Sequence, residues 1–341
     1  MKTIAITGAA GFIGGYVVQE ALERGYRVVG IDNLSKYGEA TRTFDNDPNY
    51  IFINMDVLDG EKLISIFEDA NHIIAGAAMI GGISYFHTYA YDLLATNERI
   101  IASTCDAAIR AFGKGNLEKV TYLSSSMVFE STNQWPSKEG DERLIPPPIS
   151  SYGFQKLAVE YFARAAWDQY KIPYTILRPF NCVGIGEKRA LGEVTIKSGN
   201  VYLAMSHVVP DLIQKAIKSQ GALHILGNGG QLRCYTYGGD LARGIIDSLE
   251  SPNTINDDFN LSTREATTVL ELARVIWIKI YGSDEKFEII NEPGFIYDVQ
   301  KRIPDVQKAK NYFGFEATTS LDAMLDEVIP WVKDAISRDL I

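Results

Sequence analysis

Apolar and polar residues alternate along the first half of the chain in a pattern that predicts strands separated by helices. Short apolar runs of strand length occupy residues 2–7, 27–32, 50–56, 72–78, 120–125 and 174–180. Helical or loop segments follow these runs, for example the amphipathic stretch 12–24, which Gly25 closes. This succession predicts an α/β fold with a doubly wound parallel sheet and helices on both faces.

The second half of the chain lacks this regular alternation of apolar runs and helical segments. Residues 184–206 form a long irregular stretch with several glycines and charges. The elements predicted after it are a helix at 210–219, a strand at 223–227, a helix at 268–282 and a last helix from Ser320. We therefore expect a larger domain at residues 1–179 and, mainly within 180–341, a smaller C-terminal lobe, with the chain free to cross back. A cleft between them is the expected ligand site.

Charge and cysteine content narrow the range of partners. The 341 residues include 43 acidic and 33 basic ones, for a formal net charge of −10. Such a surface repels nucleic acid and anionic membranes, so we expect neither as a partner. The three cysteines and four histidines lack the spacing of a disulfide framework or a metal site, so no metal is expected. Because no leader precedes the first strand, we expect a cytoplasmic protein.

A glycine-rich turn predicts a nucleotide site. The segment TGAAGFIGG places Gly8, Gly11 and Gly14 directly between a strand and a helix. Glycines there permit a tight turn and let backbone amides approach a pyrophosphate at the positive helix end. Asp32 ends the second strand, where a carboxylate can bind both ribose hydroxyls of NAD and repel the 2′-phosphate of NADP. We therefore expect a Rossmann-type domain that binds NAD.

The pair Tyr152 and Lys156 is the candidate catalytic group. In SSYGFQKLAVEYF the two residues are four positions apart at the start of a predicted helix, so they share one face. An unperturbed phenol has a pKa near ~10, and we expect the lysine ammonium, together with the positive charge of the nicotinamide, to lower the pKa of Tyr152. The tyrosine could then take a proton from a substrate hydroxyl while hydride leaves for NAD.

Together these motifs resemble the extended short-chain dehydrogenase/reductase family, in particular its nucleotide-sugar epimerase and dehydratase branch. The resemblance spans nearly the whole chain and includes TGAAGFIG, IDNLS, MDV, AGAAMIGG, SSSMVF, RPFNCVGIGE, GGQLRCYTYGGD and DVQKRIPD. It implies NAD as the cofactor. The cofactor-binding residues that it implies are Gly8, Gly11, Phe12, Ile13, Gly14, Asp32, Asn33, Ser35, Asp56, Val57, Ala77, Ala78, Asn97, Tyr152 and Lys156.

The resemblance also implies a nucleotide-diphosphate sugar as the substrate. Asn181 and Arg233 match residues that hold the diphosphate, and Arg302 matches a second such arginine; Ser126 and His207 complete the implied set. Arginine suits a diphosphate because its fork donates bidentate hydrogen bonds. The MIGGISYF stretch is similar to members that act on GDP-sugars, so the base, uracil or guanine, stays open.

The serine run at residues 124–126 holds the third catalytic residue. Alignment of the resembling motif on Phe129 puts the catalytic hydroxyl at Ser125, where it would hydrogen-bond the sugar oxygen that is oxidised. A slip of one residue would make Ser126 that group instead. Ser124 is expected to serve the backbone or the cofactor.

Met127 restricts the reaction. Family members that exchange protons beside the ketone carry a cysteine at this position, and dehydratases and decarboxylases carry acidic residues nearby. Methionine neither donates nor accepts a proton at neutral pH. Ser125, Tyr152, Lys156 and NAD then suffice only for reversible oxidation, which predicts C4 epimerisation through a transient 4-keto sugar. An acid in residues 187–206 would change this prediction.

Three alternatives remain open. A nucleotide-sugar dehydrogenase or reductase would release an oxidised or reduced sugar, and a dehydratase or decarboxylase would need a further acid. A non-catalytic NAD-binding module would not need the catalytic set. We also expect a homodimer, because helices near 92–112 and 152–170 carry apolar residues around much of their surface, and relatives pair these helices.

Overall fold

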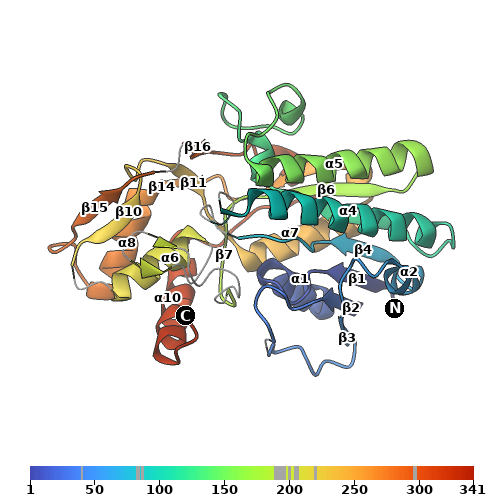
Figure 1. Ribbon diagram of the computed structural model, residues 1–341, viewed down its shortest axis with the longest axis horizontal. Coiled ribbons are helices and arrows are strands. Elements are labelled where there is room, and N and C mark those ends of the chain that lie inside the picture. The colour runs from blue at the N-terminus through green and yellow to red at the C-terminus, as the bar shows by residue number, and fades with distance from the viewer. Residues whose placement is uncertain are drawn as a thin grey trace.

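The computed structural model shows two lobes side by side (Figure 1). It describes residues 1–39, 41–81, 85, 88–187, 197–198, 201–202, 207–218, 221–294 and 298–341. The larger lobe is built on a seven-stranded sheet, and the smaller one carries short strands and three helices. Within the described residues, no helix has the length and apolar character needed to cross a membrane.

The main sheet is entirely parallel, in the order β13-β6-β5-β4-β1-β2-β3. Its strands are β1 (Thr3–Thr7), β2 (Arg27–Asp32), β3 (Tyr50–Asn54), β4 (His72–Ala75), β5 (Lys119–Leu123), β6 (Tyr174–Pro179) and β13 (Asp257–Leu261). The first six confirm the strands expected from the sequence, although several end a few residues earlier. The predicted fold class is therefore confirmed.

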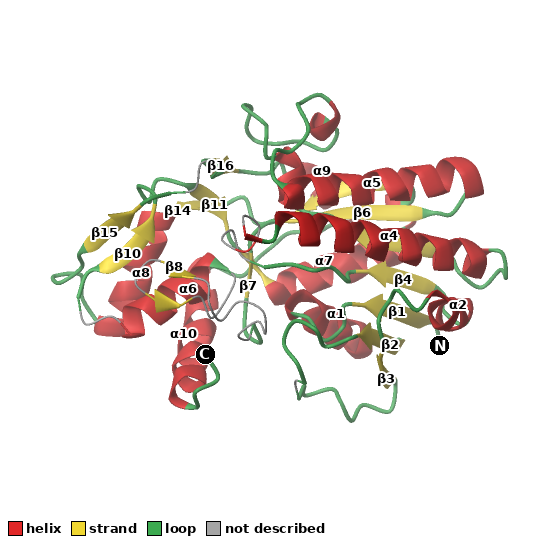
Figure 2. Ribbon diagram, in the orientation of Figure 1, coloured by secondary structure: helices red, strands yellow, loops and turns green. Residues whose placement is uncertain are grey.

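Helices cover both faces of this sheet (Figure 2). On one face lie α2 (Gly60–Glu68), α4 (Ala90–Phe112) and α5 (Ser151–Tyr170), and on the other α1 (Phe12–Glu23) and α7 (Gly238–Glu250). Strand β1 shows how the sequence serves both sides: Ala5 belongs to the core under α4 and α5, while Ile4 and Ile6 belong to the core under α1 and α7. Burial on both faces explains why the strand reads as a continuous apolar run.

The chain crosses back from the second half into the larger lobe. Strand β13 pairs with β6, and α7 and α9 (Gln307–Phe313) pack in the same core. The sequence did not predict β13, because its residues DDFNL read as polar. In the structure Asp258 pairs with the buried Arg178, and Asn260 donates from Nδ2 to the Ser137 carbonyl at 3.1 Å. Partners far along the chain thus allow a polar strand to be buried.

The smaller lobe contains the three helices and the strand β10 that the sequence predicted, together with four short strands that it did not. It is made of α6 (Val208–Lys218), β10 (Leu223–Leu226), β11 (Leu232–Cys234), β14 (Ala266–Thr268), α8 (Val269–Tyr281), β15 (Ile289–Glu292), β16 (Lys301–Arg302) and α10 (Leu321–Ser337). Thr268 and Glu271 form a capping box at the start of α8, and Ser320 caps α10. Short elements complete the chain: η1 (Ser126–Phe129), η2 (Asp141–Arg143), β7 (Cys182–Val183), β8 (Lys197–Ser198), β9 (Val201–Tyr202), β12 (Thr236–Tyr237) and η3 (Pro252–Thr254).

Candidate active site

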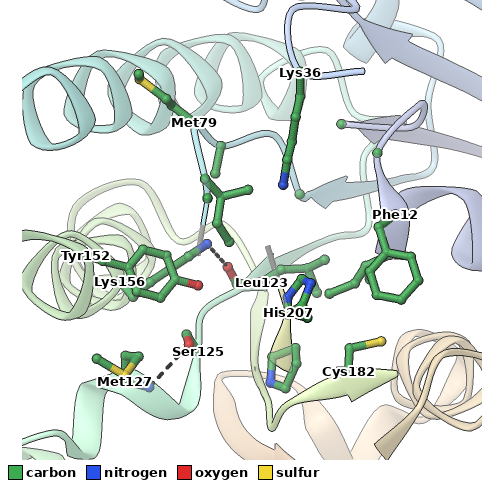
Figure 3. A pocket seen from close by; sticks show the side chains of 18 of the residues that line it. Phe12, Lys36, Met79, Leu123, Ser125, Met127, Tyr152, Lys156, Cys182 and His207 are labelled. Carbon is green, nitrogen blue, oxygen red and sulfur yellow. Dashed lines mark hydrogen bonds between the residues drawn. The ribbon is translucent and has the colours of Figure 1, made fainter. Parts of the chain in front are cut away.

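A cavity of about 730 Å³ is lined by residues of both lobes (Figure 3). The larger lobe contributes the glycine-rich turn, the carboxyl ends of β2, β4 and β5, and the start of α5. The smaller lobe contributes α6, β10 and β11. The carboxyl ends of parallel strands are the usual place for ligands in such sheets.

The glycine-rich turn fits a pyrophosphate. Gly8 has a φ of +78°, and a Cβ there would lie 2.9 Å from the Ala77 nitrogen. A Cβ on Gly14 would come within 2.0 Å of the Gly8 oxygen. Only glycine is compatible with both positions. Gly11 begins α1 without a side-chain cap, so the first amides of the helix are available to an anion.

Asp32 lies beside this turn at the end of β2. Its Oδ2 accepts a hydrogen bond from the Ala10 nitrogen at 3.1 Å, and its Oδ1 accepts one from Leu34 at 2.8 Å. Burial raises the pKa of Asp32, whereas these two hydrogen bonds and the charge of Arg42 oppose the rise. Asp56, at the next strand end, accepts from the Asn33 amide at 2.9 Å. These groups fit the ribose of NAD.

All the residues predicted for the cofactor divide into two groups, those that line the cavity and one that does not. Those that line the cavity are Gly8, Gly11, Phe12, Ile13, Gly14, Asp32, Asn33, Ser35, Asp56, Val57, Ala77, Ala78, Tyr152 and Lys156. Asn97 does not line it: its side chain is buried and holds the backbone of Met79 through Oδ1 at 2.7 Å and Nδ2 at 2.9 Å. Asn97 therefore orders the segment after β4, which itself borders the cavity.

Ser125, Tyr152 and Lys156 meet in the cavity, opposite Phe12 and His207 (Figure 3). Lys156 donates from Nζ to the Leu123 carbonyl at 3.0 Å, which ties α5 to the end of β5. The predicted lowering of the Tyr152 pKa depends on Lys156 together with the nicotinamide charge of NAD, and burial in the protein acts in the opposite direction. Burial raises the pKa of Tyr152, and the groups that oppose the rise are Ser125, through a hydrogen bond, and the charge of Arg302.

Lys156 is buried as well, so its own charged form is also disfavoured. Its Nζ lies 6.0 Å from the centre of the Tyr152 ring. Burial lowers the pKa of Lys156 to about 8, because desolvation disfavours the charged form of the ammonium group. Desolvation thus outweighs attraction between the two groups.

The three serines at the end of β5 have different surroundings. Ser124 lines the cavity and donates from Oγ to Glu160 Oε1 at 2.7 Å and to the Lys156 carbonyl at 3.4 Å, which ties it to α5. Ser125 accepts from the Met127 nitrogen at 3.2 Å and hydrogen-bonds Tyr152. Ser126 is buried and lines the cavity. Ser125 therefore lies beside Tyr152 in the cavity, and its catalytic role stays a prediction.

Two arginines that line the same cavity form a candidate anion site. Arg302 donates to Asn181 Oδ1 at 3.4 Å, and Arg233 donates to Asp298 Oδ1 at 3.2 Å. Burial and, after it, the charge of Arg233 lower the pKa of Arg302 to about 9. Burial also lowers the pKa of Arg233, although Asp298 opposes this. A buried and a half-buried guanidinium group that repel each other are suited to a dianionic ligand.

Neither Asp298 nor Glu130 was predicted from the sequence, although both line the cavity, whereas Glu187 lies in the segment 187–206, where a further acid was considered. Asp298 stands within the quoted segment DVQKRIPD, and its pairing with Arg233 depends on a contact across 65 residues. Glu187 pairs with His207, with 2.9 Å between Oε2 and Nδ1, and His207 lines the cavity. Most of the segment 187–206, named as a place for a hidden acid, lies outside the described residues. No cluster able to hold a metal occurs in the described part of the chain.

Met127 forms an apolar wall beside the catalytic group. Its side chain is buried and packs in one cluster with Tyr85, Leu93 and Tyr152. The Met127 side chain itself supplies no proton donor or acceptor beside Tyr152.

A dinucleotide turn, an acidic strand end and a Ser–Tyr–Lys group around one cavity define an NAD-dependent enzyme. The model of the NAD dependent epimerase/dehydratase family matches residues 4–262, and the chain belongs to this family. Its cofactor is NAD.

Relatives and solved structures agree with this assignment over nearly the full length. A putative UDP-glucose 4-epimerase of Methanocaldococcus jannaschii is 28% identical, over 97% of this chain and 98% of the relative. A UDP-N-acetyl-alpha-D-glucosaminuronate decarboxylase of Bacillus cytotoxicus is 27% identical, over 98% of each. The structure of UDP-glucuronic acid 4-epimerase from Bacillus cereus with UDP-glucuronic acid and NAD has a TM-score of 0.81 and 25% identity. It covers 97% of this chain and 99% of its own.

Proposed function

We propose that the chain is an NAD-dependent nucleotide-sugar 4-epimerase. The observation that carries the proposal is the meeting of Ser125, Tyr152 and Lys156 beside the apolar wall of Met127. This set can oxidise and re-form a hydroxyl but offers no acid or base at Met127 for chemistry on the neighbouring carbons. Relatives named as 4-epimerases support the same reaction.

Each residue has a distinct task in this proposal. Ser125 orients the sugar hydroxyl, and Tyr152 removes its proton and later returns it. Lys156 fixes the start of α5 against β5 through its bond to Leu123. When bound, NAD supplies a carrier for the hydride of C4 and a positive charge near Tyr152. The arginine pair holds the diphosphate, so that the sugar can turn its other face to the cofactor.

One observation favours a second candidate function. His207 lines the cavity opposite Tyr152 and pairs with Glu187 behind it, and an imidazole held by a carboxylate is able to carry a proton. Such a group could exchange hydrogens on carbons beside a ketone, as a 3,5-epimerase requires. The relative named as a decarboxylase also supports a reaction that goes beyond reversible oxidation of a hydroxyl.

The fate of carbon-bound hydrogen separates these candidates. We expect a reaction run in heavy water to give a C4-epimerised sugar without deuterium at C3, C4 or C5, because no residue beside Tyr152 exchanges those hydrogens. Mass spectrometry and proton NMR of the product measure this directly. Deuterium on carbon would reject the 4-epimerase, and its loss in a His207→Asn variant would assign the exchange to the His207 pair.

We further propose that two copies of the chain associate through α4 and α5. These helices lie next to each other on the outside of the larger lobe (Figure 1). They expose large apolar side chains: Tyr91 is 81% exposed, Tyr161 63% and Phe154 46%. Phe154 and Tyr161 are seven residues apart and so share a helix face. An exposed row of this kind suits a second copy of the same surface.

Sedimentation equilibrium tests the dimer. We expect a mass of about twice the 37.8 kDa of one chain. Tyr161→Glu should shift the protein towards the monomer because it would bury a charge at the interface. Tyr312→Glu, at a 43% exposed position on α9, is the control and should leave the mass unchanged. A single-chain mass for the unaltered protein would contradict the proposal.

A further inference from the structure

A buried ion pair on α6 borders the cavity and has no part in the mechanism above. Lys215 and Asp211 lie one helical turn apart, with 2.8 Å between Nζ and Oδ2. Lys215 is only 2% exposed and Asp211 only 7%, and both line the cavity. A buried ion pair is generally no more stable than apolar residues of the same size. Its position in the wall of a ligand cavity therefore points to a ligand.

The end of the cavity that contains Lys215 and Asp211 has the lining expected of a pocket for a nucleotide base. Apolar side chains from three elements surround the pair, namely Val208 and Leu212 of α6, Ile225 and Leu226 of β10, and Val269 of α8. Such walls suit the faces of a flat ring, with a few polar groups to fix its edge. The nucleoside end expected for NAD is elsewhere, at Asp32 and Asp56 in the larger lobe.

Gln231 connects this pocket to the anion site. It directly precedes β11, the strand that carries Arg233, and lines the cavity. Its Nε2 donates to the Leu226 carbonyl at 3.2 Å and to Asp298 at 2.8 Å. Its Oε1 is buried and has no hydrogen-bond partner within the described ranges. A nucleotide whose diphosphate lies at Arg233 would therefore place its base between Gln231 and α6.

We propose that this base is guanine and that Lys215 reads its O6 and N7 atoms. An ammonium group has three donors, of which one is directed to Asp211, and it has no acceptor. Guanine offers two adjacent acceptors to such a group, and lysine on O6 and N7 is a common guanine contact. Its 2-amino group is a donor that suits the unpaired oxygen of Gln231.

Other bases match these groups less well. Adenine and cytosine present an amino group where Lys215 needs an acceptor. Uracil presents a single carbonyl to the lysine and has no amino group for Gln231. The inference rests on the proposed nucleotide-sugar function, and it separates this chain from the relatives above, whose names contain UDP.

Calorimetric titration of GDP and UDP into the NAD-loaded protein tests the inference. We expect GDP to bind about 10–100-fold more tightly than UDP, the usual discrimination of a good base contact. Lys215→Met should remove most of this preference by weakening GDP. Lys218→Met is the matched control: Lys218 lies on the same helix, is exposed and does not line the cavity. It should leave the ratio unchanged.

Two ligand analogues keep the test independent of protein folding. 7-Deaza-GDP lacks the N7 acceptor and IDP lacks the 2-amino group, so both should bind the unaltered protein more weakly than GDP. UDP binding as tight as GDP, or analogues as good as GDP, would overturn the inference. Epimerisation of UDP-sugars with a UDP preference would refute it and leave the proposed function intact. A GDP preference without epimerisation would support the guanine inference and refute the proposed 4-epimerase function.

Discussion

Replacing Tyr152 with phenylalanine is expected to lower kcat by roughly 10²–10⁴-fold, the usual contribution of a general acid–base group. The phenyl ring keeps the packing against Met127 and Leu93, so the loss should reflect the missing hydroxyl. Steady-state rates with the preferred nucleotide sugar measure the effect. Binding of NAD and of the nucleotide diphosphate should stay close to that of the unaltered enzyme.

Tyr161→Phe is the control for this variant. Tyr161 lies on the same helix α5, but it is 63% exposed and does not line the cavity. Its rate should be unchanged. If Tyr152→Phe kept more than about a tenth of the rate, Tyr152 would not be the proton carrier, because an acid–base role is worth at least ~10²-fold.

Replacing Arg233 with alanine is expected to weaken the nucleotide sugar by roughly 10–150-fold. The value corresponds to about 1.5–3 kcal/mol, the cost of losing a hydrogen bond to a charged group. NAD binding should change little, because the residues that we expect to hold the cofactor, Asp32 and the glycine turn, lie in the larger lobe. Calorimetry with each ligand separates the two effects.

Arg264→Ala provides the matched control for this substitution. The Arg264 side chain is 80% exposed and does not line the cavity, so its removal should affect neither ligand. Arg233→Lys retains the charge without the fork and should give an intermediate loss. An unchanged substrate affinity in Arg233→Ala would remove this residue from the diphosphate site.

Local pattern alone predicted most of the larger lobe. Strands such as β1 and β2 are continuous apolar runs because they are buried on both faces, and their length and spacing are visible without any contact map. The strand β13 was not predicted, because Asp258 and Asn260 look exposed until Arg178 and Ser137 are placed beside them.

The residues of the site also divide into those that local spacing predicts and those that only the tertiary structure brings together. The sequence by itself determined the glycine turn, Asp32 and the Tyr152–Lys156 pair, because each depends on spacing within a single strand, turn or helix. Only the tertiary structure brought Arg302 to Asn181, across 121 residues. It alone also brought Gln231 to the end of the cavity where Lys215 lies.

The tertiary structure also decided the direction of the pKa shifts in the catalytic pair. Spacing places Lys156 one turn from Tyr152, but burial of both side chains sets the direction of their pKa shifts. The physical reason is that desolvation depends on every neighbour in space, whereas periodicity reports only neighbours along the helix.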